Sequence, residues 1–243
     1  MSERLPDGKG MWVRWPRPAP ARVRALAAAG VEYLLVEVLR QHPEARRRRS
    51  EATLAPELLA ACRAQDLRVI PWAFLDPRTP RWSDEAAATL IAAARDIGER
   101  WVVLDVEGSL WRHPGHAGPL RRLIDRLHAA GLLVAVTSYG AAWEMEGWAP
   151  CLSADAALWQ LARIGPSAVA TLRAVLARFS VVGVVAEPPV AAKERLSHHR
   201  LMGGLAEAMR EAGTTGHLST WVDDQYTRRM LAELATLEIP GRS

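Results

Sequence analysis

Two carboxylates end an apolar run in the middle of the chain, Trp101-Val-Val-Leu-Asp105-Val-Glu107-Gly108. Side chains alternate between the two faces of a strand, so Asp105 and Glu107 are predicted to point the same way, opposite an apolar face. Two acids that lie close together and lose water should have pKa values that move apart. One acid can then donate a proton while the other stays charged. The competing interpretation is an aspartate that caps the next helix and a glutamate that reaches solvent.

The elements that must position these acids alternate regularly along the chain. Short apolar runs predict strands at residues 11–15, 33–39, 68–75, 101–107, 132–138, 156–161, 181–186 and 217–222. Amphipathic segments between them predict helices near residues 19–29, 55–65, 84–98, 119–130, 166–179, 191–212 and 224–237. Only a weakly helical, Trp-rich segment, residues 141–151, follows the fifth strand.

This alternation predicts an α/β fold. Eight strands with crossovers in about 250 residues are what a (β/α)8 TIM-type barrel requires. A doubly wound open sheet is the main rival, but it normally has fewer strands at this length. Because no composition break divides the chain, residues 1–243 are predicted to form a single barrel domain, with residues 1–10 as a flexible N-terminal segment.

Composition narrows the classes of partner and cofactor. The net charge of +4 and the run Arg46–Arg49 favour anionic partners, but no nucleic-acid-binding motif accompanies the run, so nucleic acid is the least favoured partner. The chain has no dinucleotide-binding or phosphate-loop motif, and its loop histidines show no metal-ligand pattern, so we expect no cofactor and no metal. Cys62 and Cys151 make no disulfide framework and are expected to be inert thiols.

The sequence also predicts where the protein acts. No stretch approaches about 20 apolar residues, so no membrane partner is expected. The first ten residues lack an apolar signal core, which predicts no signal peptide. We therefore expect a cytoplasmic or virion-associated protein that would act on a cell wall if released.

Acids and aromatic residues collect where the predicted strands end. The chain has 10 Trp against 3 Tyr and 2 Phe, and indole faces can stack on sugar rings while acids and amides bind hydroxyls. Trp12 and Trp101 are expected to fill the barrel or its interface with the helices, whereas better candidates for the mouth are Trp15, Trp72, Trp111, Trp159 and Trp221. The predicted substrate-binding residues are Trp15, Glu37, Trp72, Tyr139, Trp159, Gln160, Glu187 and Trp221.

Several of these motifs together resemble family 25 of the glycoside hydrolases, the N-acetylmuramidase lysozymes. Val103-Leu-Asp105-Val-Glu107 resembles the acidic motif on the fourth strand of that family. Thr137-Ser-Tyr139, Leu158-Trp-Gln160 and Val222-Asp223 resemble its later strand ends in the same order. The resemblance implies a modified TIM barrel in which Glu107 is the general acid and Asp105 supports the N-acetyl group of the sugar. Asp223 would be an auxiliary carboxylate.

The first strand departs from the family pattern, because Met11-Trp-Val-Arg-Trp15 lacks the aspartate that the family has there. The mechanism would then be altered, assisted by Glu37 or Glu187, or lost. One hypothesis is a glycoside hydrolase that cleaves a β-glycosidic bond in a polysaccharide, with peptidoglycan as the leading substrate. The alternative is a catalytically inactive TIM-barrel protein that serves as a structural or wall-binding component of a phage virion or tail-like injection apparatus, with phage or tail assembly proteins as partners.

Overall fold

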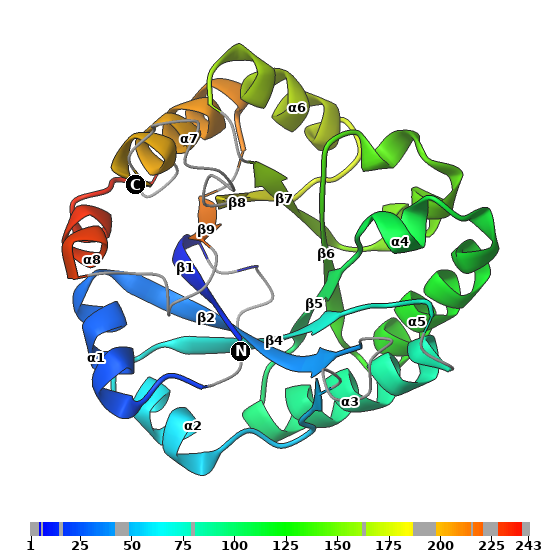
Figure 1. Ribbon diagram of the computed structural model, residues 1–243, viewed down its shortest axis with the longest axis horizontal. Coiled ribbons are helices and arrows are strands. Elements are labelled where there is room, and N and C mark those ends of the chain that lie inside the picture. Colours follow the sequence, from blue (N-terminus) through cyan, green and yellow to red (C-terminus); the bar gives the residue numbers. More distant parts are fainter. Residues whose placement is uncertain are drawn as a thin grey trace.

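The chain folds into a closed barrel of eight parallel strands surrounded by helices (Figure 1). The computed structural model describes residues 5, 7–14, 17–41, 49–78, 81–161, 164–186, 198–214, 216–220 and 228–239. The barrel strands are β1 (Gly8–Val13), β2 (Val31–Arg40), β4 (Arg68–Phe74), β5 (Trp101–Asp105), β6 (Leu133–Tyr139), β7 (Ala156–Leu161), β8 (Val182–Ala186) and β9 (His217–Thr220). Each strand pairs with the next, and β1 pairs with both β2 and β9. The predicted barrel is therefore confirmed, and the open sheet is excluded.

The first strand begins earlier than predicted, at Gly8 rather than Met11. Residues 8–10, expected to be flexible, instead form the first half of β1, and Leu5 is buried against the barrel interior. Glycines carry no apolar side chain and so gave no periodic signal. Gly10 is required because a Cβ there would lie 1.9 Å from the ring of Tyr33.

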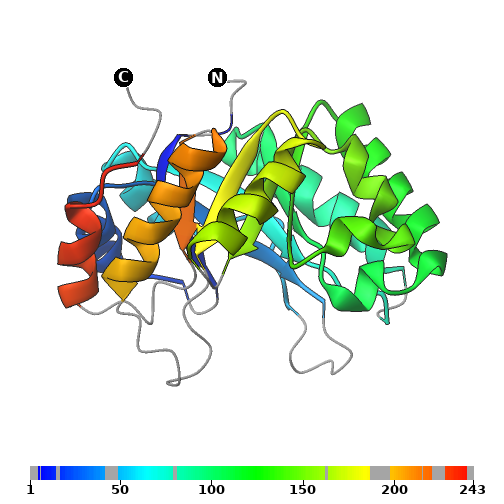
Figure 2. The same ribbon diagram turned by 90° about the horizontal axis from the view of Figure 1, so that it is seen from above.

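Helices form the outer ring, as Figures 1 and 2 show from two directions. They are α1 (Pro20–Ala28), α2 (Pro56–Arg63), α3 (Trp82–Ile97), α5 (Ala117–Ala129), α6 (Pro166–Leu176), α7 (His198–Ala212) and α8 (Arg228–Ala235). The remaining elements are short: β3 (Arg49–Ser50), α4 (Gly108–Trp111) and the 3-10 helices η2 (Pro114–His116), η3 (Ala142–Glu144) and η4 (Glu146–Ser153). The weakly helical segment after the fifth barrel strand is thus built from η3 and η4. No helix in the described part of the chain combines the length and apolar composition that a membrane span requires.

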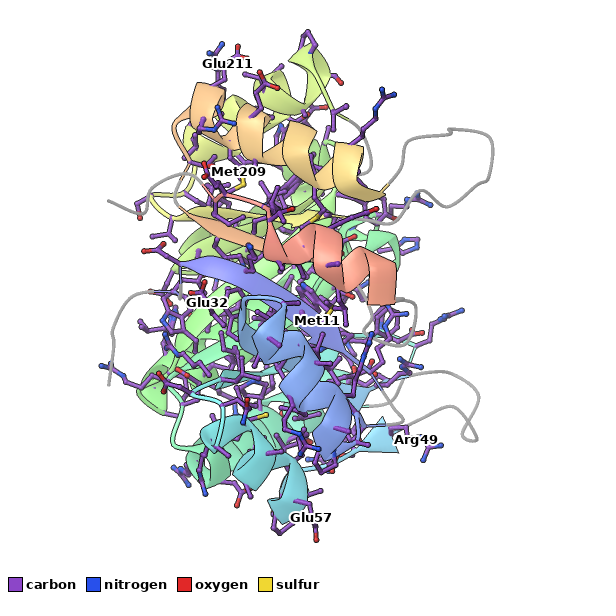
Figure 3. The ribbon with its side chains drawn as sticks, turned by 90° about the vertical axis from the view of Figure 1, so that its left-hand side faces the viewer. Met11, Glu32, Arg49, Glu57, Met209 and Glu211 are labelled. Atoms are coloured by element: carbon purple, nitrogen blue, oxygen red, sulfur yellow. The ribbon has the colours of Figure 1, made fainter. Side chains whose placement is uncertain are left out.

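Alternation along the strands divides the core into two layers. One layer packs between strands and helices, where Met11 of β1 lies beneath α1 and α8 (Figure 3). The other fills the barrel with large residues, including Trp12 and Trp101 as predicted. The barrel is therefore a packed core below its mouth.

Both cysteines are buried, Cys62 in α2 and Cys151 in η4. Burial raises the pKa of the Cys62 thiol to about 11 and that of Cys151 well above its usual value. Both groups therefore stay protonated at neutral pH, as expected for inert thiols.

The side chain of Lys9, on the first strand β1, forms hydrogen bonds with the last helix, α8. Its Nζ donates hydrogen bonds to the carbonyl oxygens of Leu234, at 2.6 Å, and Ala235, at 3.3 Å. These carbonyls belong to the last turn of α8, where a cation is favourable. We expect Lys9→Met to lower the free energy of unfolding by about 1–3 kcal/mol, measured by denaturant titration. Arg63→Met removes an exposed cation from the last turn of α2 and is the control, with an expected change within about 0.5 kcal/mol. Equal effects of the two variants would contradict this role for Lys9.

Candidate active site

Asp105 and Glu107 stand at the carboxyl end of β5, the fourth strand of the barrel. Val102, Leu104 and Val106 pack in the outer layer, whereas Trp101 and Val103 pack inside the barrel. Asp105 and Glu107 continue the inner series, so both lie on the side of the barrel mouth. Function in this fold sits at the carboxyl ends of the strands, the lower edge of the barrel in Figure 2.

Asp105 is fully buried just below this mouth. Gln160 of β7 donates a hydrogen bond from Nε2 to Oδ1 of Asp105, at 3.3 Å, and a second to Oγ1 of Thr137, at 3.2 Å. Thr137 lies directly beside Asp105 in the pairing of β5 with β6. Gln160 thus links three neighbouring strands, and its own burial makes it a residue that positions Asp105 rather than one that reaches a large substrate.

Glu107 lies two residues beyond Asp105 along the chain and is partly exposed. Burial raises the pKa of its carboxyl group, and the positive charge of Arg14 opposes this shift without cancelling it. Tyr139 at the end of β6 is 37% exposed, and its hydroxyl lies 3.2 Å from where a Cβ on Gly108 would be. A carboxyl group with a raised pKa at the barrel mouth, close in the chain to a glycine that an exposed phenol approaches, has properties that suit a general acid.

Near the ends of β1 and β2, several arginine side chains act on Glu37. Glu37 at the end of β2 is fully buried, and Arg40 donates to it from Nε and Nη2, at 2.9 and 2.7 Å. Burial raises the pKa of Glu37, while the charges of Arg40, Arg14 and Arg17 oppose the rise. Arg17 also donates to the backbone oxygen of Glu37 and to the carboxylate of Glu51. Glu37 is thus held in place by arginines at this part of the mouth.

A cavity of about 190 Å³ lies on this side, lined by Arg14, Glu37, Arg40 and Phe74. Of these residues only Glu37 is among the predicted substrate-binding set. The sequence contains a signal for Arg14, because it follows the inward-facing Trp12 by two residues. Strand alternation therefore predicts that Arg14 also faces inward. Arg40 follows a break in the pairing of β2 with β4, between Glu37 and Leu39, which simple alternation does not reveal.

Two predicted tryptophans are placed elsewhere, and these predictions are wrong. Trp159 is one residue from the inward-facing Gln160, so it points outward and packs against Trp143 and Trp148 beneath the helical layer. Trp72 does face inward, but it lies too deep: it packs against Trp12 and donates from Nε1 to the Leu35 oxygen at 3.1 Å. Both are fully buried, so neither offers a face to a sugar.

Four other predicted site residues, Trp15, Glu187, Trp221 and Asp223, lie outside the described residues, as does the side chain of Trp111. Their roles stay predictions. Within the described part of the chain, no three His, Cys, Asp or Glu residues are grouped to hold a metal ion.

Comparison with known proteins relates this chain to others through its fold. No protein-family model matches the sequence, and no curated protein matches it. Among solved structures, a GH113 β-1,4-mannanase superimposes with a TM-score of 0.69 at 13% identity, over 96% of this chain and 100% of the mannanase. The spore cortex-lytic enzyme SleL of Bacillus megaterium gives 0.61 at 10% identity, over 100% of this chain and 77% of SleL. The xylanase-α-amylase inhibitor protein XAIP-I gives 0.63 at 10% identity, over 96% and 97% of the two chains.

These likenesses show that the chain has a (β/α)8 barrel fold, which it shares with solved glycoside hydrolases. At such low identity they show the fold alone, and the three structures include both enzymes and an inhibitor protein. Activity must therefore be argued from the site itself.

Proposed function

We propose that this protein is a glycoside hydrolase that cleaves β-glycosidic bonds in a polysaccharide, with peptidoglycan as its substrate and Glu107 as general acid. The observation that carries the proposal is the position of Glu107 at the barrel mouth, with burial raising the pKa of its carboxyl group. An ordinary glutamate would lose its proton well below neutral pH, whereas a general acid must keep it at the pH of the reaction.

In this mechanism, the proton of Glu107 passes to the leaving oxygen as the bond from the anomeric carbon to that oxygen breaks. Asp105 lies on the same inner face and is held by Gln160. It would either orient an N-acetyl group that acts as internal nucleophile or stabilise the positive charge that develops on the ring. Water then adds to the anomeric carbon and gives one proton to the Glu107 carboxylate, which restores the acid. In the family 25 pattern Asp223 would be an auxiliary carboxylate, and Glu37 or Glu187 would assist in place of the missing first-strand acid.

The choice of substrate rests on two supports. Tyr139 is an exposed aromatic side chain whose hydroxyl lies near Gly108, the residue after Glu107, and it is suited to stack on or hydrogen-bond a sugar ring. The spore cortex-lytic enzymes of B. megaterium and Bacillus cereus share the barrel, which favours a structural glycan of that kind over a small sugar. Partners from a phage particle belong to the alternative below.

One observation favours the alternative of an inactive barrel that acts by docking. Arg14 directly follows the first strand, where the family 25 pattern has an acid, and its charge acts on Glu107. The inhibitor protein XAIP-I shows the same barrel in a protein named for binding rather than for catalysis. The alternative predicts binding to a wall or to virion proteins with no bond cleavage.

The proposal is tested on a panel of glycans. Purified protein is incubated with peptidoglycan, chitin oligomers and β-1,4-mannan, and new reducing ends are counted. We expect new ends with peptidoglycan. Cleavage of another member of the panel would retain the enzyme and change the substrate, whereas binding to peptidoglycan with no cleavage of any member would favour the docking alternative.

The influence of Arg14 on Glu107 gives a pH prediction. Arg14 lowers the pKa of Glu107, so Arg14→Met should raise it. A general acid works while protonated, and the fall of kcat/KM at high pH should therefore move to higher pH in this variant. Arg173→Met, which removes an exposed arginine from α6, should leave the profile unchanged. A shift of the Arg14→Met profile to lower pH, or no shift, would contradict the arrangement. Carboxyl NMR titration of Glu107 gives the same readout without activity.

A further inference from the structure

The mouth of the barrel is divided by charge. Three arginines, Arg14, Arg17 and Arg40, act on the carboxylate of Glu37, and Glu51 is the partner of Arg17. This side of the mouth, on the ends of β1 and β2, therefore carries one more positive than negative group among the residues just named. Asp105 and Glu107 lie on the other side, at the end of β5. A ligand that spans the mouth meets a cationic surface and the proton donor together.

The cavity of about 190 Å³ opens on the cationic side, and among the described residues its walls are one apolar ring and three charged groups. Phe74 lies beside Arg40 in the pairing of β2 with β4, and beside Asp105 in the pairing of β4 with β5. Phe74, on β4, therefore lies between Arg40 on β2 and Asp105 on β5. A sugar at the acid could place one substituent past Phe74 and into this cavity.

The donors of the cavity favour a planar anion. A guanidinium group carries five N–H donors, and the Arg40 side chain donates from two of its nitrogens, Nε and Nη2, to Glu37. The Arg40 side chain is 31% exposed. Arg14 lines the same cavity and acts electrostatically on both Glu37 and Glu107. Guanidinium groups match carboxylates in shape and bind them through paired hydrogen bonds. A neutral hydroxyl would use neither the charge nor the paired geometry.

We propose that the cavity lined by Arg14, Arg40, Glu37 and Phe74 is a subsite for the carboxylate of an acidic sugar unit next to the bond that is cleaved. The inference rests on the proposed function, since it places the charged unit beside Glu107. Two sources share this chemistry. One is a hexuronic acid, which carries the carboxylate on the ring, and the other is a muramic acid free of peptide, which carries it on a lactyl ether.

Binding is measured by calorimetry in a Glu107→Gln background, so that no ligand is consumed. The probes are β-1,4-linked oligoglucuronate against its neutral partner, cello-oligosaccharide, and peptide-free glycan chains of N-acetylglucosamine and N-acetylmuramic acid against chitin oligosaccharide. We expect the acidic member of at least one pair to bind about tenfold more tightly at low salt, with the preference falling as salt rises. The pair that shows the preference identifies the source of the carboxylate.

Two variants test which residues create the preference. Arg14→Met should abolish most of it. Arg40→Lys keeps a cation beside the buried Glu37, so the fold is maintained, but it removes the planar fork and should weaken the preference. Arg173→Met on α6 should keep the full preference. Equal binding of acidic and neutral partners in both pairs would overturn the subsite, as would a preference that survives both Arg14→Met and Arg40→Lys.

Failure of the subsite can be distinguished from failure of the proposed function, because one experiment measures binding and the other measures cleavage. If the wild-type protein cleaves glycans but shows no preference for acidic ones, the subsite fails and the enzyme stands. If it cleaves none of them while the arginine-dependent preference is present, the subsite stands and the enzyme fails.

Discussion

Glu107→Gln is expected to reduce glycan cleavage by at least about 100-fold, the lower end of what a positioned general acid contributes. The amide keeps the shape of the carboxyl group and removes only the proton that the leaving oxygen requires. Binding of the glycan should change little, because an amide can still hydrogen-bond a hydroxyl. The loss should therefore appear in kcat rather than in the dissociation constant, measured by steady-state kinetics and calorimetry.

The same substitution supplies its own control for folding. In the folded protein the pKa of Glu107 is raised, so the folded state holds this proton more tightly than the unfolded state does. Stability from this group is therefore full below the unfolded pKa and is lost as pH rises through the folded pKa. The amide introduced by Glu107→Gln does not ionise, so the variant should be at least as stable as wild type at neutral pH, in thermal unfolding. If Glu107→Gln is inactive and also less stable than wild type, its loss of activity would not be evidence that Glu107 donates a proton.

Gly10→Ala is expected to lower the free energy of unfolding by about 3 kcal/mol, towards the upper end of the usual cost of overpacking a core. A Cβ at this position would lie 1.9 and 2.2 Å from two ring atoms of Tyr33. Tyr33 is fully buried and stacks on His217, with ring centroids 4.7 Å apart, so the ring has little room to move. The cost arises inside the barrel and should be visible in urea titration.

Gly203→Ala is the matched control for that experiment. Gly203 lies within α7, and a Cβ added there meets no atom within 4 Å. Alanine favours a helix over glycine, so this variant should gain about 0.5–1 kcal/mol. If both variants shift stability in the same direction, the close approach of Gly10 to Tyr33 does not govern the packing of the barrel.

The barrel was predictable because its signals are local. Period-2 runs such as residues 101–107 and the helical segments between them are set by near neighbours in sequence, and they also place Asp105 and Glu107 on one face. The same alternation, applied to residues 158–160, would have placed Gln160 inward and Trp159 outward. The residue type of Trp159 and its place near a strand end instead favour the mouth, and neither feature reports which face of the strand it is on.

Depth and long-range pairing were not predictable in this way. Trp72 has the right orientation, but its position two residues before the end of β4 lets it fill the barrel rather than line the mouth. The cavity lined by Arg14, Glu37, Arg40 and Phe74 joins the residue after β1 to residues of β2 and β4, including Arg40 beyond the irregular pairing of β2. No single segment of sequence contains that information, because it arises only when the strands are aligned in the closed barrel.

Release of soluble fragments from a defined peptidoglycan, read by mass spectrometry, tests the role of Glu107 most directly. Wild-type protein and Glu107→Gln are incubated in parallel with the same preparation. We expect fragments whose masses correspond to hydrolysis of a glycosidic bond with the wild type, and none above background with the variant. Equal release by both proteins would contradict the role of Glu107 and would make Glu37 and Glu187 the next residues to test.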